Sequence, residues 1–403
     1  MGPARAIADL LAHGRGRVLL FCWLGWVFDF HDLILFSFVK RSVAADLVLG
    51  DDAIAWIEGA GLFASALGAV LFGRVADRIG RRRAMTASIA VYSAGALLTA
   101  AAGDGWLLLA ARTLTGLGVG GEWGIGHAVV AETFAGRDRD RAHGLLQAGS
   151  PIAMALAAVT GLFVAPHVGW RWVFAASALP AALVFAARWA MPGPDRAPVP
   201  TAHGSGLRAL LAPRHRRATL VLFAILLLHM TGFWCVYAEL PAALMRDLHV
   251  SPTAAGTFQL AVNGVHVAAD VAFGWLAARA GRRRMFVLFC AWFALAQLLL
   301  AWFWGDLARD FVTFTAAAAA MGVGAGTWSC FGALFGVHYP PALRATAASL
   351  LYSVARGAQL FAKPLLAALA AAFGGMQPAL WVGAGCALGS ALLLRALPRA
   401  PAE

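Results

Sequence analysis

Long apolar runs separated by short polar gaps make up most of the chain. Each run is about 20 residues long, which is the length that an α-helix needs to cross the hydrocarbon core of a bilayer. The pattern therefore predicts twelve membrane-spanning helices. The expected spans are 18–39, 53–73, 84–103, 106–133, 142–165, 170–190, 218–240, 253–276, 285–304, 309–331, 343–373 and 378–396.

Composition supports this interpretation, because 61% of the 403 residues are hydrophobic, only 13% are charged and the mean hydropathy is +0.73. A soluble protein could not cover so much apolar surface with a polar coat. We therefore expect an all-α protein whose main partner is the lipid bilayer. The formal net charge of +12 would suggest a nucleic-acid partner in a soluble chain. Here the basic residues lie in the gaps between spans, so we expect no nucleic-acid partner.

The charges in the gaps predict the orientation of the chain. Counted from the N-terminus, the even gaps are rich in arginine and the odd gaps carry most of the aspartates. Basic loops stay in the cytoplasm, so both termini and all even gaps are expected there. The heavy use of arginine and alanine suggests a bacterial protein of the inner membrane. The even-gap bases include Arg78, Arg81–Arg83, Arg137, Arg139, Arg141, Arg208, Arg214, Arg279, Arg282–Arg284 and Arg344.

An internal repeat divides the chain. The stretch "GRVADRIGRRRAM" at 73–85 recurs as "GWLAARAGRRRMF" at 274–286. The longest gap lies between the two copies and is rich in Pro, Gly and Arg. Repeated halves of six spans are typical of transporters, with the binding site at the midplane between them. We therefore predict two pseudo-symmetric six-helix bundles, 1–190 and 218–403, joined by a cytoplasmic linker at 191–217.

The same stretch resembles a known signature. "GRVADRIGRRR" is similar to the loop between spans 2 and 3 of the major facilitator superfamily, and "RTLTGLGVGGEWG" at 112–124 is similar to its span-4 motif. "DFHDLILFSF" and "GFWCVYAELPAALMRDL" further resemble the metabolite–proton symporter branch. That branch handles organic acids such as lactate, sialate and aromatic acids. The resemblance implies a proton-coupled transporter.

The resemblance also implies that this loop acts as a latch for one conformational state. A glycine at position 73 lets two helices approach closely. The alternative is that the arginines only anchor the loop in the cytoplasm. In the second copy the acidic position is Ala278, so any latch there is expected to be weaker or absent. The latch residues are Gly73, Asp77, Arg78, Gly80 and Arg81.

Charged side chains inside the spans are costly and mark functional sites. A carboxylate at the centre of a membrane helix costs about 2.5–3.5 kcal/mol on insertion scales, yet span 1 keeps two. Helical spacing places polar residues of spans 1, 4, 8 and 11 on one face of each helix, which predicts a shared aqueous cavity. These residues are Asp29, Asp32, Arg112, Thr115, Glu122, Gln259, Asn263, His266, Asp270, Tyr352, Arg356, Gln359 and Lys363.

The acids of the first half are the candidates for proton coupling. Asp32 comes first, because it resembles the span-1 acid that partners a span-4 arginine, here Arg112, in proton-coupled relatives. Asp29 lies one turn away and is expected to share the proton, since neighbouring carboxylates perturb each other. Glu122 is either a second proton carrier or a partner of Arg112. The alternative for the two aspartates is that one of them only pairs structurally with Arg112.

The bases of the second half are the candidates for substrate binding. Arg356 is the leading one, because a guanidinium grips a carboxylate through two hydrogen bonds. Lys363 comes second. The alternative is that Arg356 pairs internally with Asp270 or Glu122. His266 is either a proton relay or a structural hydrogen-bonding residue. The other candidates for the substrate site are Arg112, Gln359, Tyr352 and Asn263.

These observations favour a secondary transporter that imports a small organic anion with protons by alternating access. The alternative is a proton-antiport exporter of a drug or metabolite. We expect no enzyme activity, no cofactor and no metal site, because the sequence has no ATP-binding loop, metal-ligand cluster or nucleophile motif. The protein is expected to act as a monomer.

Overall fold

The structure is a computed structural model that describes residues 14–179, 207–237, 240–306, 310–359, 368, 372–373 and 375–398. All regular secondary structure within these ranges is helical, as the sequence predicts. The first half contains α2 (Arg15–Asp46), α3 (Asp51–Ile79), α4 (Arg81–Ala100), α5 (Gly105–Thr133), α6 (Gly136–Gln147), α7 (Gly149–Val159), η1 (Thr160–Val164), α8 (Ala165–Val168) and α9 (Trp170–Ser177).

The second half has the same style of long helices. It contains α11 (Leu207–Leu210), α12 (Pro213–Tyr237), α13 (Leu240–Asp247), α14 (Pro252–Ala280), α15 (Arg282–Trp302), η2 (Trp304–Asp306), α16 (Phe311–Ala325), η3 (Gly326–Trp328), α17 (Ser329–His338), α18 (Pro341–Gly357), α20 (Gln377–Leu393) and η4 (Leu394–Ala396).

The helices fit the predicted membrane crossings. In the described ranges, eight helical stretches are long and apolar enough to span a bilayer. The four remaining predicted spans coincide with α4, α5, α9 and α18. The structure describes α4 and α5 over their whole predicted length. The second part of span 6 and much of span 11 lie outside the described residues.

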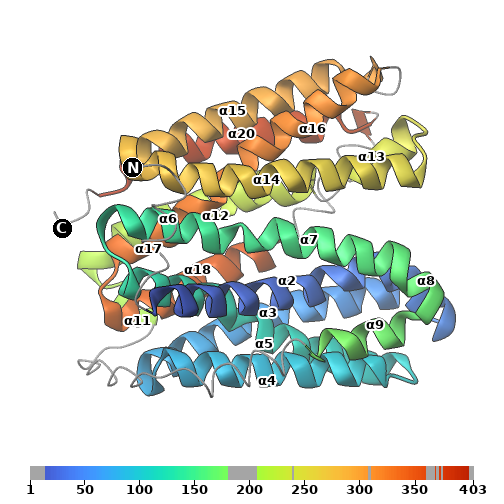
Figure 1. Cartoon of the computed structure of the whole chain (residues 1–403), viewed down its shortest axis with the longest axis horizontal. Coiled ribbons are helices and arrows are strands. Elements are labelled where there is room, and N and C mark those ends of the chain that lie inside the picture. The colour runs from blue at the N-terminus through green and yellow to red at the C-terminus, as the bar shows by residue number, and fades with distance from the viewer. Residues whose placement is uncertain are drawn as a thin grey trace.

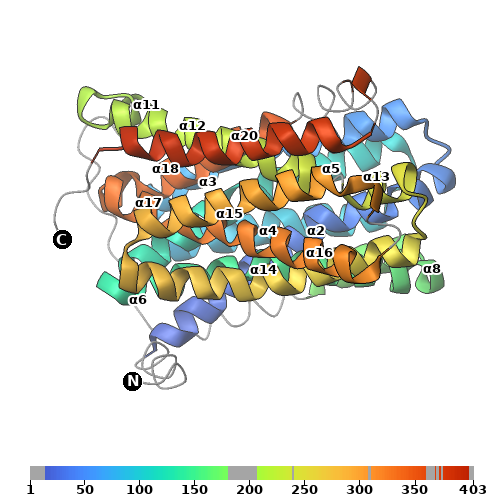
Figure 2. The same ribbon diagram turned by 90° about the horizontal axis from the view of Figure 1, so that it is seen from above.

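The helices form two bundles that lie side by side. Figure 1 shows the helices of the first half (blue to green) in the lower part and α14, α15, α16 and α20 (yellow to red) in the upper part. The long helices run roughly along the long axis in this view and in the view from above (Figure 2). Helices α6 and α7 lie beside α14, and α18 packs against α3 and α5. These helices form the interface between the bundles.

The arginine-rich loops gather at one end of the molecule, which we call the basic end. Arg282 of α15 pairs with Asp140 of α6 at 3.3 Å, and Arg15 of α2 lies 3.9 Å from Asp138. The neighbouring Arg283 donates a hydrogen bond to the carbonyl of Leu397 at 3.0 Å. The first and last described helices therefore begin and end at the basic end, on the same side as these loops.

The predicted repeat is visible in the backbone. Gly80, between α3 and α4, has φ +99°, and Gly281, between α14 and α15, has φ +89°. Residues with a side chain rarely adopt a positive φ. Each copy of the motif therefore needs its glycine to turn the chain into the next helix. Residues 191–206 of the predicted linker lie outside the described ranges, and α12 begins at Pro213.

Two close backbone approaches hold the bundles together. A side chain at Gly124 of α5 would collide with the backbone nitrogen and hydroxyl of Ser349 on α18. A methyl group at Gly144 of α6 would lie 2.7 Å from the carbonyl oxygen of Asp270 and 3.1 Å from the Cα of Gly274, both on α14. Small residues at these positions let helices of different bundles pack with almost no side chain between them.

Candidate functional site

Asp32 and Arg112 form an ion pair inside the first bundle. Arg112 Nη1 on α5 donates to Asp32 Oδ2 on α2 at 3.0 Å, and the Ser177 hydroxyl on α9 donates to Asp32 Oδ1 at 3.0 Å. The guanidinium carbon lies 4.9 Å from the ring centre of Phe36 and 5.5 Å from that of Phe174. Both carboxylate oxygens of Asp32 therefore have a partner, and the pair is buried.

Asp29 lies one turn earlier on α2 and has different neighbours. It interacts electrostatically with Glu122 of α5 and with Arg356 of α18, as well as with Asp32. The side chain is fully buried, and neither of its oxygens has a hydrogen-bond partner among the described residues. A buried carboxylate in this position is costly unless a proton or a cation offsets its charge. Asp29 and Arg356 thus bring charges of the two bundles together.

Arg356 lies over an aromatic ring, and two of its nitrogen atoms have no hydrogen-bond partner among the described residues. Its guanidinium carbon lies 5.5 Å from the ring centre of Tyr352, and the side chain is 2% exposed. Its Nε and Nη1 atoms have no hydrogen-bond partner in the described part of the chain. Asp270, one of the internal partners considered above, interacts with His266 and Ser329 instead.

Glu122 is placed by a glycine on the neighbouring helix. A methyl group at Gly25 of α2 would lie 2.9 Å from Glu122 Oε2. The missing side chain at Gly25 therefore makes room for the carboxylate, which is 1% exposed. Gly25 and Asp29 are one turn apart on the same face of α2. Glu122, which lies against Gly25, therefore interacts electrostatically with Asp29.

Aromatic rings from both bundles surround Tyr352. The Trp123 indole of α5 stacks on it, with ring centres 3.9 Å apart and planes inclined by 13°. Trp26 of α2 and Trp328 of η3 meet it edge-on at 6.4 Å and 6.1 Å. The Trp123 Nε1–H donates to Gln147 Oε1 at 3.1 Å, which fixes the plane of the stack. Tyr352 is one of the predicted substrate-site residues, and the packing of the helices brings Trp26 and Trp328 to it.

The remaining substrate candidates are less central. Asn263 accepts hydrogen bonds from Tyr237 at 2.8 Å and from Gln259 at 3.2 Å, both within the second bundle. His266 lies 3.3 Å from Asp270 on the same helix. Gln359 donates to the carbonyl of Ala355 at 3.0 Å and to the Thr231 hydroxyl at 3.4 Å. Lys363 lies outside the described residues.

The predicted latch residues connect α3 to the second bundle. Asp77 accepts from the backbone N–H of Thr346 at 3.2 Å and from the hydroxyl of the same residue. Arg81 lies 2.7 Å from Asp77 and donates to the carbonyl of Pro341 at 2.7 Å. A methyl group at Gly73 would lie 3.1 Å from the Cα of Thr346. These contacts close the basic end between α3 and α18.

The latch residues Arg78 and Gly80 make none of the contacts with α18 described above. Arg78 has an exposed side chain on α3, and Gly80 supplies the turn described above. The network extends to Glu132 of α5, which lies 3.1 Å from Arg81 and 4.0 Å from Arg344.

The second copy of the motif also reaches the other bundle, although it has Ala278 at the acidic position. Arg282 lies 3.3 Å from Asp140, an acid that α6 of the first bundle supplies. The same arginine donates to the carbonyl of Ala333 at 3.4 Å. The sequence comparison of the two copies missed this contact because the acid comes from a different helix.

A pair of histidines at the bundle interface was not predicted either. His127 Nδ1 on α5 lies 2.8 Å from His143 Nδ1 on α6. Both rings press against Gly332 of α17, where a side chain would collide with them. His127 also contacts Gln147 at 3.3 Å. Neither histidine has a motif around it, and only the packing of three helices brings them together.

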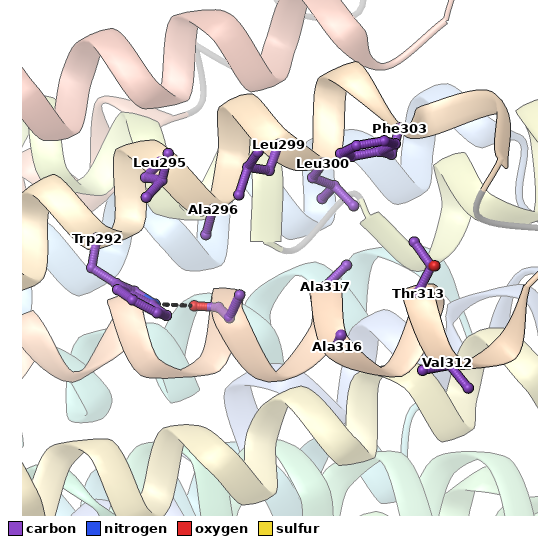
Figure 3. A pocket seen from close by; sticks show the side chains of 11 residues that line it. Trp292, Leu295, Ala296, Leu299, Leu300, Phe303, Val312, Thr313, Ala316 and Ala317 are labelled. Carbon is purple, nitrogen blue, oxygen red and sulfur yellow. Dashed lines mark hydrogen bonds between the residues drawn. The ribbon is translucent and has the colours of Figure 1, made fainter.

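An apolar cavity of about 370 Å³ lies between α15 and α16. Figure 3 shows Leu295, Leu299 and Phe303 on one side and Val312 and Ala316 on the other. Its one drawn polar contact is the hydrogen bond from Trp292 Nε1 to the carbonyl of Ala320, at 3.0 Å. Because no charged side chain of the described residues lines it, this cavity does not suit an anion.

The chain also matches a known protein family. The model of the Major Facilitator Superfamily matches the chain twice, over residues 21–230 and 222–403. The protein therefore belongs to this superfamily, as the signature loop predicted. It is a multi-pass membrane transporter and not an enzyme.

Similar proteins agree with this assignment. A putative metabolite transport protein of Haemophilus influenzae is 28% identical over 356 residues, which cover 84% of this chain and 85% of that protein. A gentisate transporter of Corynebacterium glutamicum is 28% identical over 398 residues, covering 95% and 88% of the two chains. The proton:xylose symporter XylE, solved with 6-bromo-6-deoxy-D-glucose, has the same fold, with a TM-score of 0.79, 15% identity and 95% of each chain covered.

Proposed function

We infer that this transporter imports a small carboxylate together with protons by alternating access. One observation carries the proposal. Arg356 is a buried cation of the second bundle, two of its donor nitrogens have no hydrogen-bond partner among the described residues, and it interacts electrostatically with the buried acid Asp29 of the first bundle. Buried polar groups are almost always hydrogen-bonded, so these donors are suited to binding a ligand.

The chemistry of Arg356 favours a carboxylate. A guanidinium presents its N–H groups in a planar fork that matches the two oxygens of a carboxylate. The stack of Tyr352 and Trp123 beside it provides an apolar wall that suits a planar ring. The relative named as a gentisate transporter supports this choice. Aromatic carboxylates are therefore the first substrates to test.

The acids near Arg356 give a physical reason for proton coupling. A substrate carboxylate at Arg356 would add a negative charge close to Asp29 and Glu122. In a buried site such charges repel strongly, and a proton on one of the acids removes the repulsion. We assign the proton to Asp29 and Glu122. The Asp32–Arg112 pair, whose oxygens already have partners, holds α2 against α5 and α9.

The orientation follows from the basic end. The loops there carry the arginines that the positive-inside rule places in the cytoplasm. In this assignment the Asp77–Arg81 latch closes the cytoplasmic side of a bacterial inner-membrane protein, and both termini are cytoplasmic. Import then requires the contacts of Asp77 and Arg81 with α18 to break before the substrate leaves. The two bundles, 1–190 and 218–403, move about the linker at 191–217, and a monomer suffices.

Uptake by proteoliposomes tests the proposal. A thermal-shift screen of carboxylic acids at two pH values first selects the labelled substrate, beginning with gentisate and its uncharged amide. An acidic outer solution should accelerate uptake of the acid and not of the amide. Arg356→Gln should abolish uptake, whereas Arg356→Lys should keep part of it, because lysine retains the charge without the fork.

Three outcomes would contradict parts of the proposal. Uptake that ignores the pH gradient would remove proton coupling. Transport of cations or neutral compounds only would remove the role of Arg356. Efflux driven by protons moving inward would favour the alternative of an antiport exporter. Reconstitution with the basic end outward, shown by protease cleavage, provides the control for direction.

A further inference from the structure

A second buried acid lies in the second bundle, away from Arg356. The Ser329 hydroxyl of α17 donates to Asp270 Oδ1 at 2.7 Å, and His266 Nε2 lies 3.3 Å from Asp270 Oδ2. His266 Nδ1 lies 3.4 Å from the hydroxyl of Tyr237, on α12. Asp270 is 0% exposed and His266 is 1% exposed. The two side chains are one helical turn apart and form a buried acid–imidazole pair.

The neighbours of this pair do not supply a compensating cation. Among the residues that the structure describes, no lysine or arginine pairs with Asp270, and α7, α16 and η3 bring no titratable side chain to α14. Several titratable groups on the other packed helices have their own contacts. These contacts are His143 with His127, Asp140 with Arg282, His229 with Thr327, Tyr237 with Asn263, and Cys330 with the carbonyl of Arg282.

Charge balance then fixes the number of protons on the pair. With no proton the pair carries a buried negative charge, and with two it carries a buried positive charge. Either state is expensive in an apolar interior without a partner. With a single proton the pair is neutral overall, whether the proton is on the carboxyl or on the imidazole. The closed state described here therefore holds one proton at Asp270 and His266.

The position of Asp270 connects this proton to the motion of the bundles. Its carbonyl oxygen lies against Gly144 of α6, at the backbone contact between the bundles. Separation of α6 from α14 would bring water to this turn of α14. On the other side, the hydroxyl of Tyr237 donates to Asn263, and Asn263 accepts from Gln259, one turn further from the basic end. This chain gives the pair polar neighbours along α14.

We propose that the Asp270–His266 pair is a second proton-binding site, loaded and unloaded once in each transport cycle. This proposal rests on the proposed function, because the second site adds a proton to the one assigned to Asp29 and Glu122. A monocarboxylate that enters with two protons carries a net positive charge across the membrane. With the first proton alone, the same uptake would be electroneutral.

Infrared difference spectra against pH test the site without any substrate. Protein in lipid vesicles should show a protonated-carboxyl band that titrates and that Asp270→Asn removes. His266→Gln, which keeps the carboxyl, should shift the pH at which this band changes. Asp310→Asn, which removes an exposed acid at the start of α16, serves as the control and should leave the band in place. A carboxyl that keeps one protonation state over the whole pH range of the folded protein would overturn the proposal.

Charge movement during uptake tests the role in transport. A potassium diffusion potential, negative inside, should accelerate uptake of the labelled monocarboxylate by the parent protein and not by Asp270→Asn. Equal voltage dependence in the two proteins would overturn the proposal and leave proton-coupled uptake intact. If no carboxylate is transported, the proposed function fails, and the infrared titration still decides whether Asp270 and His266 exchange a proton. If Asp270→Asn transports no substrate, the infrared titration and the His266→Gln variant decide the proposal.

Discussion

The indole of Trp123 lies face to face with the phenol ring of Tyr352, with ring centres 3.9 Å apart, so a single aromatic stack joins α5 of one bundle to α18 of the other. Arg356 lies over the same tyrosine, one turn along α18. The stack therefore links the contact between the bundles to the cation that we assign to the substrate.

Removing the ring of Tyr352 should weaken both functions of the stack. An aromatic pair contributes about 0.5–1.5 kcal/mol beyond the area it buries. We expect Tyr352→Ala to raise the KM for uptake by about 2- to 10-fold and to lower the melting temperature. Tyr352→Phe keeps the ring and should resemble the parent protein in both measurements. Equal loss in the Phe and Ala variants would show that the hydroxyl, and not the stack, is required.

Breaking the Asp32–Arg112 pair should destabilise the first bundle. Asp32→Asn leaves the Arg112 guanidinium buried without its carboxylate, and the loss of one partner of a buried ion pair costs about 3–5 kcal/mol. Thermal unfolding in detergent measures the change. The double variant Asp32→Asn, Arg112→Gln removes the unpaired charge and should recover part of the stability. If the double variant is as unstable as the sum of the single variants, the two residues act independently.

Filling the space at Gly25 should displace Glu122. A β-carbon there would lie 2.9 Å from Glu122 Oε2, and the two methyl groups that valine carries on its β-carbon leave less room still. We expect Gly25→Val to slow uptake several-fold while the protein still reaches the membrane, because the carboxylate shifts away from Asp29. Gly264→Val on α14, where a β-carbon meets no atom within 4 Å, is the matched control. Normal uptake by Gly25→Val would show that the position of Glu122 is not critical.

Neutralising Asp77 should open the basic end more often. Asp77→Asn loses the charge that attracts Arg81 and weakens the acceptor of the Thr346 bonds. We expect faster labelling of Ser349→Cys, a buried position on α18, by a membrane-impermeant maleimide added on that side. The protein has cysteines of its own, so the labelling rate measured without Ser349→Cys is subtracted from the rate measured with it. Arg74→Gln changes an exposed charge on the same helix and should leave the labelling rate unchanged; an equal increase there would point to a general loosening of α3.

Several features of the fold and site could be predicted because they depend on local patterns. The length of the apolar runs predicted the spans, and the repeated motif predicted two related halves. The Asp32–Arg112 pair was expected from the resemblance to proton-coupled transporters, and the structure contains it. Such charges need partners, and few partners are available in the membrane.

Other features depend on how helices far apart in the sequence pack. Three residues along an α-helix turn the side chain by about 300°, so Asp29 and Asp32 point about 60° apart. Helical periodicity could place both on one face but could not decide that one meets Arg112 and the other faces Arg356. The Arg282–Asp140 and His127–His143 contacts likewise join different helices, and neither residue type nor spacing within one segment indicates them.

The contact of Gly124 with Ser349 makes the release of the bundles abrupt. Dispersion forces act over less than a few ångströms, and a gap of about 0.5–1 Å already forfeits a quarter to a half of the attraction. Intermediate widths gain little from this contact, so the opening at the basic end should be either shut or wide in most molecules, with few molecules between the two states.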